Sequence, residues 1–210
     1  KDNKERLIIA LNYMLDCVDE VVYVDWGSPN NISLLELPYI INNIPKTNKL
    51  VHVKISRKEI SNIVPKGNHF IQQSIIRNIA IRKSTGDYII STNVDIIFPN
   101  KQELYQVINN DDKQTFYSIS RKDVPMNSII NLYNEDKTKL RKHLSSYIKV
   151  RGIDNNPEYK FKIEAKTQIS ENSELYKQYI KYARIWNCGD FQMAHRSIWF
   201  NVKGFEEKML

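Results

Sequence analysis

Cysteine is scarce in this sequence, and the two that occur lie far apart. Neither Cys17 nor Cys188 belongs to a C-x-x-C pair. This excludes zinc fingers and thioredoxin-type chemistry, which both need such pairs. We expect two free thiols in a reducing compartment, which predicts a cytoplasmic location.

Long apolar runs are also missing. No stretch of about 18 uncharged apolar residues occurs, so we expect no membrane segment within this chain. The charged start, residues 1–6, lacks the apolar core of a signal peptide. Because the chain begins without Met, and Leu210 follows no stop signal, we expect it to be a piece of a longer protein.

Acidic residues are the minority among the charged ones. The chain has 31 Lys and Arg against 24 Asp and Glu, a net charge of +7. Such a surface suits an anionic partner, but the lysines are scattered, so charge alone does not choose between a nucleotide diphosphate, nucleic acid and an anionic membrane. No alternation of basic and aromatic residues resembles an RNA-recognition motif. We therefore expect no nucleic-acid partner.

What the sequence does contain is an alternation of helical and strand patterns. A chain of 210 residues that is 41% apolar can bury one sizeable core, which predicts a single domain over residues 1–210. Alternation of this kind predicts an α/β fold with a mostly parallel central sheet flanked by helices. The expected order is a helix at 7–15, a strand at 21–24, a helix at 34–41 interrupted by Pro38, a strand at 50–55, a helix at 71–86 and a strand at 88–92.

The pattern changes after Pro99. Residues 123–182 are polar and rich in Asn and Lys, and we expect only one helix there, at 140–148. On either side we expect a helix at 101–107, a strand at 115–120, a strand at 191–194 and a helix at 197–202 closed by Gly204.

Polar residues that follow strands are the first candidates for a site, because ligands of open parallel sheets bind outside the carboxyl ends of the strands. Asp25 follows one predicted strand, and Asn93 and Asp95 follow another. A nucleoside at Asp25 and a divalent cation at Asp95 are one interpretation. Local structure is the other: an Asx-turn or cap at Asp25, and a capped turn before Pro99.

Four segments, taken together, resemble glycosyltransferase family 2. Residues 18–28 (VDEVVYVDWGS) are similar to its first nucleotide-binding segment, and residues 77–90 to the helix and strand that precede its D-x-D motif. Asn93-Val94-Asp95 occupies the D-x-D place. Residues 189–192, with Arg196 and residues 199–206, resemble its acceptor-side segment and the G-G-F-D-E-like turn that follows.

The resemblance implies a GT-A fold and an inverting, metal-dependent transfer of a sugar from a nucleotide-sugar donor, expected to be a UDP-sugar, to a hydroxyl of a glycan, protein or lipid. Residues 1–122 become the nucleotide-binding half and 123–210 the acceptor-side half. The implied roles are nucleotide-sugar binding by Asp25, Ser28, Arg77 and Asn93, binding of Mn²⁺ or Mg²⁺ by Asp95, and catalysis as general base by Asp190.

This sequence departs from the family pattern at four places. Trp26 replaces the usual second Asp, and Asn93 replaces the first Asp of D-x-D. The family's first strand is missing from the chain or lies upstream of it, and its usual base segment lies beyond Leu210. Two alternatives therefore stay open: a non-catalytic nucleotide-sugar-binding module, and a nucleotidyltransferase.

Overall fold

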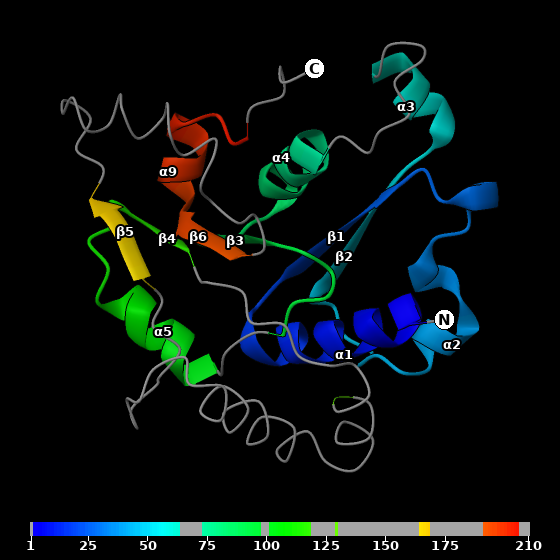
Figure 1. Ribbon diagram of the computed structural model, residues 1–210, viewed down its shortest axis with the longest axis horizontal. Helices are drawn as coiled ribbons and strands as arrows, with labels where there is room; N and C mark the ends of the chain where they lie inside the picture. Colours follow the sequence, from blue (N-terminus) through cyan, green and yellow to red (C-terminus); the bar gives the residue numbers. More distant parts are fainter. Residues whose placement is uncertain are drawn as a thin grey trace.

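The computed structural model describes residues 2–63, 73–97, 101–118, 129, 164–168 and 191–205, which form a mixed α/β structure (Figure 1). It opens on a helix, α1 (Asp2–Cys17), as the spacing of apolar residues predicts. The other helices are η1 (Pro29–Asn31), η2 (Leu34–Glu36), α2 (Pro38–Ile41), α3 (Arg57–Ile63), α4 (Gln73–Lys83), α5 (Lys101–Asn109) and α9 (Arg196–Asn201).

The strands form two sheets, listed here with their bounds. They are β1 (Val21–Trp26), β2 (Leu50–Ile55), β3 (Tyr88–Thr92), β4 (Thr115–Ser118), β5 (Glu164–Gln168) and β6 (Phe191–His195). β1 and β2 pair in parallel, and a second sheet has the order β3-β6-β4-β5 with antiparallel pairs. The prediction of a single, mostly parallel sheet is therefore wrong for the described residues. Among the described residues, the predicted helices and strands occur in the predicted order, but α3 and β5 were not expected. Local sequence does not encode which strands become neighbours.

Helix α1 packs against both sheets. Its residues Leu7 and Leu11 pack in one core with Leu35 and Ile40, beside β1 and β2. On the same helix, Ala10, Met14 and Cys17 pack in a second core with residues of α5, β4 and β6. Each fully buried aliphatic side chain contributes about 1.5–3 kcal/mol. One helix thus holds the two sheets in a fixed relation.

β1 and β3 run in the same direction. Glu20, directly before β1, accepts hydrogen bonds from the amide and hydroxyl of Thr85, shortly before β3 (2.8 and 3.0 Å). Beyond the far end of β3, Asp95 forms an ion pair with Arg6 on the first turns of α1 (3.6 Å). Only residues 18–20 join α1 to β1, so β1 runs back along the helix toward the same end. Although they belong to different sheets, both strands therefore end on the same side of the structure, toward the N-terminal end of α1, and this side is called the shared edge.

Two helices differ from the sequence-based expectations. Pro38 begins α2 instead of interrupting a longer helix, because its fixed φ and missing N–H suit the first helical position. α3 was not expected. It begins with a capping box, in which Ser56 accepts from the amide of Glu59 and Glu59 accepts from that of Ser56 (3.2 and 2.7 Å). The predicted helix at 140–148 lies outside the described residues.

The end of the described chain is fixed by a buried amide. Asn78 donates to the carbonyl of Phe205 and accepts from its amide (2.9 and 2.7 Å). Gly204 adopts φ +73°, and a Cβ there would collide with the Asn78 side chain. A glycine is therefore required at this turn.

Candidate functional site

Asp25 is the most constrained residue of the candidate site. It lies within β1 instead of after it, and only 6% of it is exposed. Its Oδ1 accepts a hydrogen bond from the Ser28 hydroxyl across the turn at Gly27 (2.6 Å). Its Oδ2 is buried and has no hydrogen-bond partner within the part of the chain that the structure describes. A buried carboxylate oxygen without a donor is costly, which makes this atom a candidate acceptor for a group other than the described residues.

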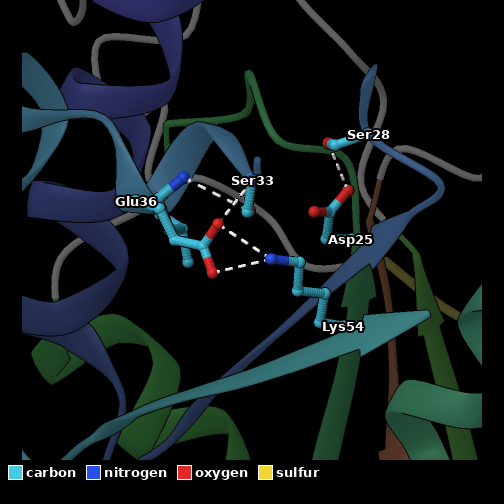
Figure 2. A network of polar contacts seen from close by, with 6 residues as sticks. Asp25, Ser28, Ser33, Glu36 and Lys54 are labelled. Carbon is cyan, nitrogen blue, oxygen red and sulfur yellow. Dashed lines mark hydrogen bonds and ion pairs between the residues drawn. The ribbon is translucent and has the colours of Figure 1, made fainter. Parts of the chain in front are cut away.

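The cation nearest to Asp25 in the sheet is bound elsewhere. Lys54 lies opposite Asp25 in the β1–β2 register, but its ammonium contacts both carboxylate oxygens of Glu36 (2.9 Å each). Figure 2 shows this network beside the separate Asp25–Ser28 contact. The hydrogen bond from Lys54, followed by that from the Ser33 amide, holds the pKa of Glu36 below its usual value. Lys54 is thus held away from Asp25.

The charge of Asp25 also affects Tyr23, which lies on the same strand. Burial, and after it the negative charge of Asp25, raises the pKa of Tyr23 above its usual value. The shift favours the protonated Tyr23 hydroxyl, the form that an ordinary tyrosine already has at neutral pH.

Arg77 and Asn93, two predicted site residues from different elements, are in contact. Arg77 on α4 donates from Nη2 to Oδ1 of Asn93, which directly follows β3 (2.7 Å). The guanidinium also lies over the Phe205 ring, 5.2 Å from its centroid. Stacking and hydrogen bonding fix the plane of the guanidinium, a geometry that suits phosphate oxygens.

Asp95, the predicted metal ligand, does not belong to a preformed metal site. Its side chain is 42% exposed and is paired with Arg6, and the nearby Asn93 oxygen is engaged by Arg77. Across the described ranges, no group of three or more His, Cys, Asp or Glu side chains is arranged to hold an ion. A divalent cation needs several oxygen ligands, and the residues described here do not supply them.

The remaining candidates have structural roles or lie outside the description. Asn78 fixes Phe205 through two hydrogen bonds. His195 has a structural role, since it caps α9 by accepting from the Ser197 amide (3.3 Å). Asp190 and Cys188 lie outside the described residues, whereas Cys17 is buried and forms no disulfide with a described residue.

No family model, no curated protein and no solved structure matches this chain. In the described ranges, none of the helices is both long and apolar enough to cross a membrane. The function is therefore argued from the arrangement of the site residues.

Two residues that contact the candidate site or its neighbours were not predicted from the sequence. Arg6 reaches Asp95 from α1, and Glu36 withdraws Lys54 from Asp25. A signal for Glu36 was present, since Ser33 and Glu36 have the S-x-x-E spacing of the capping box that they form. Arg6 gave no local signal, because its contact depends on how α1 packs.

Proposed function

We propose that this chain is the nucleotide-sugar-binding part of an inverting glycosyltransferase, which transfers a sugar from a UDP-sugar to an acceptor hydroxyl. The observation that supports this proposal most is the buried Oδ2 of Asp25, which lacks a donor in the described structure. A nucleoside supplies such donors through a base N–H or a ribose O–H. The resemblance of residues 18–28 to a nucleotide-binding segment leads to the same residue.

The other site residues are assigned by their position along the shared edge. Ser28 orients the Asp25 carboxylate, so that Oδ2 faces the nucleoside. Arg77, held over Phe205, faces the diphosphate, and Asn93 contacts the ribose or first phosphate. Side chains that are already held in position reduce the entropy lost when the nucleotide sugar binds.

The proposed reaction forms a bond from the acceptor oxygen to the anomeric carbon and breaks the bond to the diphosphate. A carboxylate removes the acceptor proton, and attack opposite the leaving group inverts the configuration. Asp190 is the proposed base within this sequence. Dependence on Mn²⁺ or Mg²⁺ stays a prediction.

Titration calorimetry with a panel of nucleotides tests the proposal. UDP and UDP-sugars should bind, whereas ADP should bind weakly, because a purine presents different donors and a larger ring. Failure of every nucleotide to bind would remove the assignment of Asp25. Binding without acceptor-dependent turnover would favour the alternative, a non-catalytic nucleotide-sugar-binding module.

A further inference from the structure

One face of the second sheet changes from apolar to polar toward the shared edge. Helices α4 and α9 lie on the side of this face in Figure 1, opposite α1 and α5. Ile89 of β3 and Ala194 of β6, which are paired, pack in a core with Trp199 of α9. The next pair on the same face is Ser91 and Gln192, since side chains two residues apart in a strand point the same way. The apolar core on this face therefore ends in a polar pair.

Gln192 is buried, yet its amide oxygen lacks a donor. The residue is 6% exposed, and its Oε1 accepts no hydrogen bond within the described ranges. The buried amide of Asn78 provides a contrast, because its oxygen and its nitrogen are both bonded to the backbone of Phe205. A buried amide oxygen without a donor costs free energy and is rare in folded proteins. Oε1 of Gln192 is therefore a candidate acceptor for a group other than the described residues.

The contact between Arg77 and Asn93 lies next to this polar pair. Asn93 follows Ser91 by two residues, a spacing that covers about 7 Å in an extended strand. Arg77 reaches Asn93 from α4, so the contact lies on the α4 side of the sheet, as Gln192 does. Two neighbouring groups of one ligand can thus be bound here, one by Arg77 and Asn93 and the other by Gln192.

The order of the strands indicates which group of a nucleotide sugar lies at Gln192. β1 and β3 line a common cavity, and β6 pairs with β3, which lies between β1 and β6 in Figure 1. The nucleoside is assigned to Asp25 on β1, and the diphosphate to Arg77 and Asn93 at the end of β3. The next strand, β6, therefore meets the group that follows the diphosphate, which is the sugar.

The chemistry of the amide leads to the same group. A glutamine oxygen is a neutral acceptor, so it binds only a group that donates a hydrogen bond. The diphosphate offers oxygens that accept, whereas the sugar offers hydroxyls that donate. A buried acceptor also discriminates strongly, because an analogue without the matching hydroxyl leaves it unpaired.

We infer that Gln192 is a specificity-determining residue, whose Oε1 accepts a hydrogen bond from one hydroxyl of the transferred sugar. This inference rests on the proposed function, which supplies the nucleotide sugar as the ligand. Gln192 contacts neither the nucleoside nor the diphosphate, so it affects the choice of sugar and not the binding of UDP.

Titration calorimetry of Gln192→Met tests this inference with UDP and with the tightest binder among UDP-glucose, UDP-galactose and UDP-N-acetylglucosamine. Methionine keeps the length of the side chain but cannot accept as the amide does. The affinity for the UDP-sugar should fall by about 3- to 10-fold, the effect of one neutral hydrogen bond, while the affinity for UDP stays the same. Gln106→Met, at an exposed glutamine of α5, is the matched control and should change neither affinity.

Deoxy analogues of the same UDP-sugar identify the hydroxyl. Removal of the contacted hydroxyl should weaken binding to the unmodified chain by a similar factor and should not weaken binding to Gln192→Met any further. If every deoxy analogue weakens binding equally in the two proteins, the sugar hydroxyls do not contact Gln192 and the inference is wrong.

Urea unfolding separates this role from a structural one. Because Oε1 has no donor in the described structure, Gln192→Met should unfold at the same urea concentration as the unmodified chain or at a higher one. A lower midpoint would mean that the amide is bound within the protein, and would overturn the inference. An unchanged ratio of UDP-sugar to UDP affinity in Gln192→Met would overturn this inference alone, whereas failure of every nucleotide to bind the unmodified chain would overturn the proposed function with it.

Discussion

The two ends of the candidate site differ in how they are prepared for a ligand. At the end of β1, Asp25 is buried and oriented by Ser28, and the nearest cation is held by Glu36. Beyond β3, Asp95 is 42% exposed and is paired with Arg6, and Asn93 is bound by Arg77. Among the residues that the structure describes, the first end has an acceptor without a donor, whereas the second has acceptors that are already engaged.

Because of this difference, we assign recognition of the nucleoside to the buried end and compensation of the phosphate charge to the exposed end. Burial makes a hydrogen bond to Asp25 strong and selective, because water does not compete well in a low-dielectric site. The exposed end is screened by solvent, so single contacts there contribute less. We therefore expect nucleoside binding to depend mainly on Asp25, and substitutions beyond β3 to have smaller effects.

The largest expected effect is that of Asp25→Asn on UDP binding. The asparagine keeps the shape and the contact with Ser28, but places a donor where Oδ2 accepted. Loss of a hydrogen bond to a charged group costs about 1.5–3 kcal/mol, which is about a 10- to 100-fold loss of affinity by calorimetry. Asp19→Asn is the matched control, since that carboxylate is 77% exposed at the opposite end of β1. Equal losses of UDP affinity for Asp25→Asn and Asp19→Asn would contradict a specific role of Asp25 in nucleoside binding.

A second prediction concerns metal dependence at the exposed end. Asp95→Ala should remove any gain in UDP affinity from Mn²⁺, whereas Asn93→Asp should increase it by adding a carboxylate. Both variants are compared with the unmodified chain in Mn²⁺ and in chelator. If Asp95→Ala and the unmodified chain bind UDP equally in Mn²⁺, the metal assignment of Asp95 is wrong.

Arg77→Lys should lower UDP affinity by about 3- to 10-fold, because lysine keeps the charge but loses a hydrogen bond worth about 0.5–1.5 kcal/mol. The planar contact with Phe205 is lost too. Arg82→Lys on the same helix α4 is the control and should leave UDP affinity unchanged. If Arg77→Lys also leaves UDP affinity unchanged, the assignment of Arg77 to the diphosphate is wrong.

The smallest expected effect is that of Glu36→Gln on stability. The pKa of Glu36 is lowered in the folded chain, so its stabilising contribution is present above the ordinary glutamate value and is lost as pH falls through the lowered one. Urea unfolding should show a slightly less stable variant near neutral pH and no difference in strong acid. A difference in the free energy of unfolding that grows as the pH falls would contradict this pH dependence.

The local elements of the fold were predictable from sequence, whereas the pairing of strands was not. The apolar spacing of α1 and the runs at 50–55 and 88–92 gave their elements within a few residues. β5 was not expected, because its sequence, Glu-Ala-Lys-Thr-Gln, carries no apolar alternation. Sheet order depends on contacts between distant segments, about which local periodicity carries no information.

The site was predictable at the level of residue types and edges. Position after a strand identified Asp25, Asn93 and Asp95, and the structure brings Asn93 into contact with Arg77. The buried Oδ2 of Asp25, which has no hydrogen-bond donor among the described residues, was not predictable. Its state depends on burial by surrounding elements and on Glu36 binding Lys54. The Arg6–Asp95 ion pair likewise arises from the packing of α1.

The most direct test of the central claim is a crystal structure of the chain grown with UDP. A base N–H or ribose O–H should lie within hydrogen-bonding distance of Asp25 Oδ2, about 2.7–3.2 Å, with Ser28 still bonded to Oδ1. A nucleotide bound elsewhere, with Asp25 Oδ2 contacting only water or protein, would contradict the account.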